Sequence, residues 1–136
     1  MAENKEKDVL AGNRTIEEKI GLLQQNPTPE ALAVALTAIR RQMKAGGQLV
    51  VSVDASMQMQ AMEIEGKTYI PAFTSMDEEM KGDAKVMSTF TADMQKLFDF
   101  VLSNEELDGI ALNPWNRALL LGRHLIGIVL GRESGT

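Results

Sequence analysis

Few side chains in this sequence could carry nucleophilic or acid–base chemistry. The chain has no cysteine, and His124 is its only histidine. A Ser–His–Asp arrangement needs a histidine as the proton carrier, but His124 stands beside Arg123 inside a predicted amphipathic helix, where a histidine is most often an ordinary surface residue. We therefore expect no nucleophilic hydrolase, while carboxylate chemistry stays open.

The densest group of carboxylates is Asp77-Glu78-Glu79. A hard cation such as Mg²⁺ needs oxygen ligands that converge from different parts of the chain, whereas three consecutive residues on a helix point in different directions. Acidic residues at this place favour the positively polarised start of a helix. Asp54, at the end of a predicted strand, is the other acid placed as active sites often are, and alone it is weak evidence for a site.

Two further patterns resemble ligand sites. Met57, Met59 and Met62 offer thioethers, which are soft ligands for Cu(I). The nine methionines are spread along the whole chain, which favours their role as flexible fillers of a half-buried strand. Gly46-Gly47 has no third glycine and no following Lys-Ser or Lys-Thr, so it is neither a Walker loop nor a dinucleotide fingerprint. We predict no cofactor and no bound metal.

Composition limits the kinds of partner. The chain has 136 residues and a net charge of −5, and its pI is about 4.9. An acidic chain without clustered Lys and Arg disfavours nucleic acid and acidic membrane surfaces. Residues 1–13 lack the apolar segment of a signal peptide, and the longest apolar run, 119–130, is interrupted and too short to span a bilayer. We expect a bacterial, cytoplasmic location.

Helical periodicity predicts the elements that must position any site. Residues 1–14 are predicted to be a flexible tail, and residues 15–136 a single domain. A first helix is expected to begin near Thr15. A second begins at Thr28, which is a typical N-cap before a proline, and ends at Gly46-Gly47.

Four helical faces are expected to be buried. The third helix is predicted to be capped by Thr89 or Thr91, and the last helix follows Leu121. The predicted buried faces are, in chain order, Ile16, Ile20 and Leu23; Leu32, Leu36, Ile39 and Met43; Met94, Leu97, Phe98, Val101 and Leu102; and Leu125, Ile126, Val129 and Leu130.

Strands are predicted between and beside these helices. Residues 48–53 form a valine-rich strand, and residues 57–65 alternate with a change of phase at Gln60-Ala61 that predicts a bulge. Pro71, in the strand over residues 68–74, predicts one unpaired edge or a bulge there. A shorter strand is expected over residues 85–90, and a hairpin within residues 109–121. The predicted fold class is α+β (mixed α/β): a single twisted mixed β-sheet with helices packed mainly on one face.

Two strand ends carry the candidate binding residues, because ligands often bind at strand ends and a tryptophan at a loop tip is a typical hot-spot residue. These residues are Phe73, Thr74, Ser75, Asn113, Pro114 and Trp115. Pro114 suits the second position of a type I turn, with Asn113 before it. The alternative is that Trp115 folds back into the core and Asn113 only satisfies the turn.

Two motifs together resemble one family. Tyr69-Ile70-Pro71-Ala72-Phe73-Thr74-Ser75 resembles the P-x-F-T-S strand of the SseB N-terminal domain family, and Gly109-Ile110-Ala111-Leu112-Asn113-Pro114-Trp115 resembles its G-[IV]-x-[ILV]-N-P strand. Their order and separation match, and the resemblance extends over residues 29–130. It implies an α/β fold and a bacterial cytoplasmic protein, and no established catalytic residues. The sequence departs at Asn116, where a glycine is common, and we expect no second, C-terminal domain of the kind that longer members carry.

The leading hypothesis is a non-enzymatic domain that binds a protein or peptide, or a further copy of itself as a homo-oligomer. The alternative is a small-ligand or weakly catalytic site, with Asp54, Ser75 and Asn113 as polar groups around Phe73 and Trp115. A third hypothesis is a regulator or immunity-type partner of a neighbouring gene product. None of the three involves nucleic acid or a membrane.

Overall fold

The computed structural model describes residue 10 and residues 12–53, 58–75, 88–114 and 118–131. In this part of the chain, four helices and a six-stranded sheet form an α+β fold, as the sequence predicts. The helices are α2 (Asn13–Gln25), α3 (Pro29–Lys44), α5 (Met94–Ser103) and α6 (Arg123–Leu130). The strands are β1 (Gln48–Val53), β2 (Met62–Ile64), β3 (Lys67–Phe73), β4 (Ser88–Asp93), β5 (Gly109–Leu112) and β6 (Leu119–Gly122).

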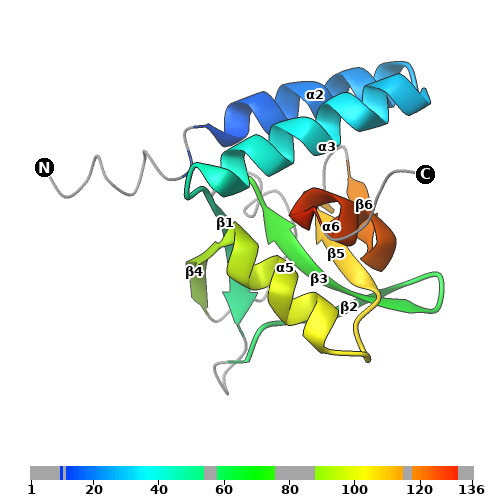
Figure 1. Cartoon of the computed structure of the whole chain (residues 1–136). Helices are drawn as coiled ribbons and strands as arrows, with labels where there is room; N and C mark the ends of the chain where they lie inside the picture. Colours follow the sequence, from blue (N-terminus) through cyan, green and yellow to red (C-terminus); the bar gives the residue numbers. More distant parts are fainter. Residues whose placement is uncertain (1–9, 11, 54–57, 76–87, 115–117, 132–136) are drawn as a thin grey trace, which may run out of the picture.

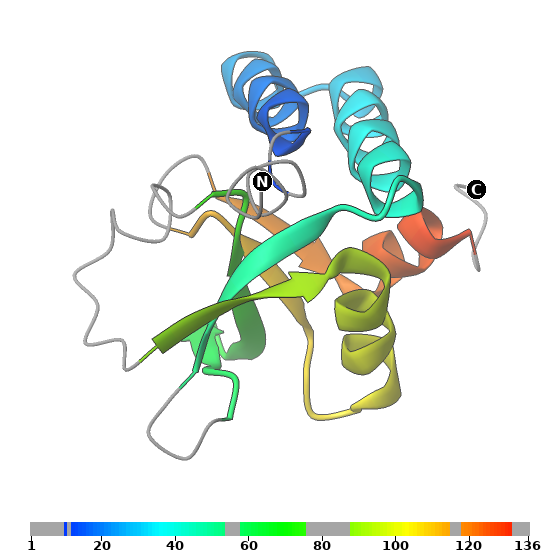
Figure 2. The same cartoon turned by 90° about the vertical axis from the view of Figure 1, so that its left-hand side faces the viewer.

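The sheet is mixed and open. Its strand order is β4-β1-β3-β5-β6, with β2 paired to β3 beside β1. β3 and β5 are parallel neighbours, and every other pair is antiparallel. Figures 1 and 2 show α5 and α6 on one face of the sheet, with α2 and α3 side by side across one end of it. The carboxyl ends of β3 and β5 therefore lie at the same edge, close to α2.

Helix α3 begins and ends as the local sequence predicts. The Thr28 hydroxyl accepts a hydrogen bond from the Ala31 N–H at 3.0 Å, which satisfies one of the free donors of the first turn. At the other end Gly46 has φ +85°, a left-handed conformation that glycine adopts without strain. The N–H of Gly47 then donates to the Gln42 carbonyl at 2.8 Å, which is the long bond of a Schellman motif.

The predicted boundary between the fourth strand and the third helix is wrong. Thr89 and Thr91 lie within β4, which pairs with β1 along all six of its residues. The N-cap is Asp93, whose carboxylate accepts from the Lys96 N–H at 3.1 Å. Threonine is β-branched and suits a strand as well as a cap, and the pairing with β1 decided between these roles.

The structure departs from regular pairing at both places where the sequence predicts an irregularity. At Gln60 and Ala61, where a bulge is predicted, the chain changes partner: Met59 bridges to β1, and pairing with β3 begins at Met62. Along β3, the pairing with β1 reaches Ala72 and the pairing with β2 begins at Tyr69. Pro71 falls in the gap between these two partners, where the ladder needs no N–H donor.

The core fills the space between the sheet and the helices. Its largest fully buried side chains include Phe98, Ile39, Leu49, Ile110 and Ile126. The predicted helical faces supply most of it, but the residues at their margins are only partly buried: Leu23, Leu32, Leu102, Leu125 and Leu130. The helices therefore bury narrower stripes than the sequence predicts, and apolar side chains remain accessible along α3 and α6.

Candidate functional site

The two predicted strand ends meet in the structure. Thr74 follows β3 directly and Asn113 follows β5 directly, and the parallel pairing of these strands places them side by side. The Thr74 N–H donates to Asn113 Oδ1 at 3.0 Å, and Asn113 Nδ2 donates to Thr74 Oγ1 at 3.0 Å. Asn113 has φ +50°, a conformation that asparagine tolerates better than most residues.

Helix α2 completes this polar group. Asn13 Nδ2 donates to the Gln48 carbonyl at 2.7 Å and to the Thr74 carbonyl at 3.1 Å. The Thr74 hydroxyl donates to the Glu17 carboxylate. We call Asn13, Glu17, Thr74 and Asn113 the strand-end cluster. It connects α2 to the start of β1 and to the carboxyl ends of the two parallel strands.

Three members of the strand-end cluster are almost completely removed from solvent. Asn13 and Thr74 are 0% exposed, and Asn113 is 3% exposed. Their polar atoms bind one another or the backbone, although Asn13 Oδ1 has no hydrogen-bond partner among the described residues. Because buried polar groups stabilise a fold only when they are paired, this arrangement explains how α2 is held against the sheet.

Sequence reasoning missed Asn13 and Glu17, because a helix was expected to begin near Thr15. Helix α2 begins at Asn13, two residues earlier. A signal for Asn13 was available, since it stands three residues before Ile16, on the same predicted helical face. Its polar side chain made that position look like part of the tail.

The remaining predicted site residues differ in exposure. Phe73 is buried, whereas Ser75 and Pro114 are half-buried. Trp115 and Asp54 lie outside the described residues, as do Met57, Asp77, Glu78, Glu79 and Asn116. A binding surface or a small-ligand site at the strand ends stays a prediction.

We expect the substitution Thr74→Val to lower the free energy of unfolding by about 2 kcal/mol, because it leaves buried Asn113 Nδ2 and the Glu17 carboxylate without the Thr74 hydroxyl. Urea unfolding followed by circular dichroism measures this loss. Thr68→Val is the control, since Thr68 lies in β3, the strand that Thr74 follows, and its backbone N–H makes the hydrogen bond to Asp108. Equal losses for both variants would contradict a special role of the cluster.

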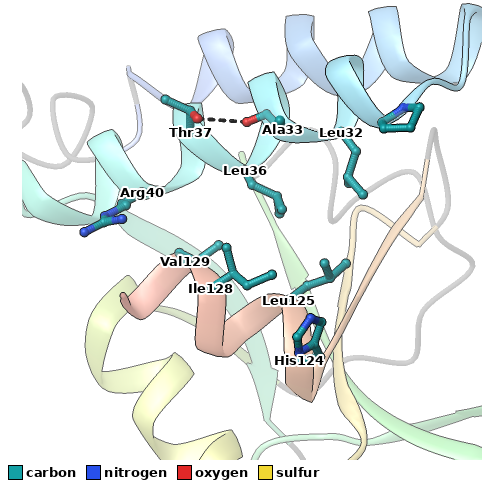
Figure 3. A pocket seen from close by; sticks show the side chains of 10 residues that line it. Leu32, Ala33, Leu36, Thr37, Arg40, His124, Leu125, Ile128 and Val129 are labelled. Carbon is teal, nitrogen blue, oxygen red and sulfur yellow. Dashed lines mark hydrogen bonds between the residues drawn. The ribbon is translucent and has the colours of Figure 1, made fainter. Parts of the chain in front are cut away.

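A second feature is an apolar groove between α3 and α6, with a volume of about 410 Å³. Figure 3 shows side chains from the two helices facing one another across it. Leu36 and Val129 are buried at its base, and Leu32, Leu125 and Ile128 are half-buried along its sides. Pro29, Ala33, Thr37, Arg40 and His124 complete the lining.

The polar side chains of the groove are few, and Arg40 is the permanently charged one among them. Arg40 and His124 lie toward opposite ends of it in Figure 3, and both are exposed. The Thr37 hydroxyl donates to the Ala33 carbonyl of its own helix at 2.8 Å. None of the described residues that line the groove is acidic. An apolar lining with a guanidinium toward one end can bind a chain segment.

The described residues contain neither a cluster of metal-ligating side chains nor a membrane-spanning helix. Within the described residues, no set of three or more His, Asp or Glu side chains is arranged to hold a metal ion. None of the helices in that part of the chain is both long and apolar enough to cross a bilayer.

Comparison with known families matches residues 17–126 to the model of the SseB protein N-terminal domain. The chain belongs to the SseB N-terminal domain family. The match includes both segments on which the resemblance rests, so the contact between Thr74 and Asn113 lies within the family region. Neither the curated proteins nor the solved structures that were compared contain a match.

Family membership accounts for the fold and specifies no role, so function has to be argued from surfaces. Sequence reasoning assigned the groove's Leu32 and Leu125 to buried faces, and these residues are only half-buried. The sequence could not predict the groove, because no sequence pattern indicates that these two distant helices, α3 and α6, lie side by side.

Proposed function

We propose that this SseB-family domain is a non-enzymatic module that binds an amphipathic protein segment in the groove between α3 and α6. The observation that carries the proposal is an apolar groove of about 410 Å³ with the guanidinium of Arg40 toward one end. Pockets of a few hundred cubic ångströms lined mainly by apolar side chains are the usual form of binding sites.

The apolar lining supplies the driving force. Leu32, Leu125 and Ile128 are half-buried in the free domain, so each has surface that a partner can still remove from water. Burial of apolar surface contributes about 25 cal/mol per Å². Anchoring side chains of the partner would bury these three residues and cover Leu36 and Val129 beneath them.

The charge of Arg40 selects the chemistry of the partner. Arg40 and His124 stand at a groove without acidic lining residues, in a chain with a net charge of −5. Electrostatic complementarity mainly determines which partner is accepted. We therefore expect the bound segment to carry Asp or Glu beside its apolar anchors, since a guanidinium binds a carboxylate in two parallel hydrogen bonds.

The shape of the groove favours a helical segment. The lining of α3 extends from Pro29 to Arg40, which corresponds to about 17 Å along the helix axis, or three turns. A helix bound between two helices presents apolar residues at positions i, i+3 or i+4, and i+7. We also propose that the protein is located in the bacterial cytoplasm, which the cysteine-free sequence and the family resemblance support.

The test uses a phage-displayed library of helical peptides selected against the purified domain. We expect enriched peptides with an acidic residue beside apolar residues in the helical pattern. Arg40→Glu should weaken their binding about fivefold in fluorescence anisotropy, as expected for reversal of one exposed charge. Arg41→Glu is the matched control, because Arg41 is equally exposed on the same helix and lines a different hollow, between α2 and α3.

A second variant tests the apolar lining. Leu125→Gln preserves the length of the side chain and should weaken the same peptides, with folding checked by thermal denaturation. The Arg40 guanidinium also lies close to Gly131 at the carboxyl end of α6, so the same fold check is needed for Arg40→Glu. Peptides that bind both variants as tightly as the unaltered domain would overturn the proposal.

A further inference from the structure

Strand β4 forms one edge of the sheet. It is the first strand in the order β4-β1-β3-β5-β6, and it pairs with β1 over all six residues. Among the described strands none pairs with its other edge. An edge strand presents a row of backbone N–H and C=O groups that can accept another strand.

Most of β4 lacks the side chains that commonly prevent an edge strand from pairing with another chain. Residues 88–92 contain no charged side chain and no proline, which are the common devices against edge pairing. Phe90 lies at the middle of this stretch and is 40% exposed. The opposite edge strand, β6, is shorter, with four residues. The long and uncharged edge is therefore the one at β4.

The sequence of this edge is self-complementary. Thr89-Phe90-Thr91 reads the same in both directions, so an antiparallel pair about a two-fold axis at Phe90 places Phe90 opposite Phe90 and Thr89 opposite Thr91. Aromatic pairs and threonine pairs across two strands are both favourable.

Electrostatics also favour a second copy at this place. The whole chain carries a net charge of −5, so two copies repel each other. The repulsion is weaker when the surfaces in contact are neutral than when they are acidic. Asp93 is the charged residue of β4, and its carboxylate caps α5. In the two-fold arrangement the two Asp93 residues stand about 20 Å apart along the strands, from six residues at the strand rise.

We infer that two copies of this chain associate by antiparallel pairing of their β4 strands about a two-fold axis at Phe90. The pairing joins the two sheets into one and leaves the groove between α3 and α6 free. It is independent of the function proposed above, because it involves neither α3 nor α6.

The absence of cysteine from the chain makes a direct test possible. A Phe90→Cys variant has one thiol, so a disulfide between protein chains can form only with a second copy; the first thiolate reacts with oxidised glutathione to a mixed disulfide, and the thiolate of the second copy displaces glutathione. Directly opposed residues of an antiparallel pair have Cα atoms about 4.5–5.5 Å apart, within the range of a disulfide. With oxidised glutathione we expect a disulfide-linked dimer on non-reducing gels.

Phe100→Cys is the matched control, because Phe100 is exposed to a similar extent, 43%, and lies on α5. The dimer should form at least about tenfold faster at position 90, as the raised local concentration of the opposed thiols implies. Equal rates at the two positions would overturn the inference.

A second measurement needs no cysteine. Sedimentation equilibrium of the unaltered chain should show a concentration-dependent dimer, and Phe90→Lys should weaken it by about tenfold or more, because like charges then stand directly opposite. Circular dichroism checks that Phe90→Lys is folded. An unaltered chain that remains monomeric up to millimolar concentration, or a dimer that Phe90→Lys leaves unchanged, would contradict the pairing.

Discussion

The substitution Gly109→Ala is expected to lower the free energy of unfolding by about 3 kcal/mol. Gly109 begins β5 and lies opposite Gly122 of β6. A Cβ atom at Gly109 would stand 2.1 Å from the carbonyl oxygen of Leu121. This oxygen belongs to the backbone of Leu121, a buried residue of β6, so the clash can be relieved only if β5 and β6 move apart. Urea unfolding followed by circular dichroism measures the loss.

Gly122→Ala is the control for this prediction. Gly122 is the direct cross-strand partner of Gly109, and a Cβ there meets nothing within 4 Å. Alanine is a poorer N-cap than glycine, but it also restricts the unfolded chain, so we expect a change within about 0.5 kcal/mol. A similar cost at both positions would show that close strand approach is not what requires glycine at Gly109.

The second large effect is expected for Arg123→Met, at about 3 kcal/mol of lost stability. Arg123 Nη1 donates to the carbonyls of Val101, Asn104 and Leu107 at 2.8–3.0 Å, and Nη2 donates to that of Leu102 at 2.7 Å. One guanidinium thus satisfies the carbonyls at the end of α5, where a cation also interacts favourably with the helix dipole. Methionine keeps much of the aliphatic stem and removes the donors.

The control for this second prediction is Arg123→Lys. Lysine keeps the positive charge but has one ammonium group in place of the planar fork, so we expect it to lose about half as much stability as methionine does. Thermal denaturation of both variants, beside the unaltered domain, gives the comparison. If lysine and methionine were equally harmful, the charge would contribute nothing at this helix end; if neither were harmful, the four hydrogen bonds would not stabilise the domain.

Local features were predictable because neighbouring residues determine them. Thr28 before Pro29 and the pair Gly46-Gly47 bound a helix through capping and backbone conformation, which need no distant partner. The interruption at Gln60-Ala61 and the position of Pro71 also followed from local rules of strand pairing. The prediction failed at Thr89 and Thr91, where threonine suits both a strand and a cap.

The structure explains why two residues of the second family motif, Gly109 and Asn113, are needed at their positions. Gly109 is needed because a neighbouring strand passes within reach of a Cβ. Asn113 combines a left-handed backbone with hydrogen bonds to Thr74, 39 residues away in the sequence. The sequence placed both residues in one hairpin and identified Asn113 as a turn residue and a candidate binding residue, without its contact to Thr74.

The sequence by itself determined the α+β class, most of the helices and strands, and the family, because these depend on periodicity, capping and short ordered motifs. Tertiary structure alone decided which surfaces are available. It brought Asn13 to Thr74 across 61 residues, buried Thr74 and Asn113, and placed α3 beside α6 to form the groove. The physical reason is that a side chain's exposure depends on the elements packed against it, and strand order and helix packing are set by the whole core.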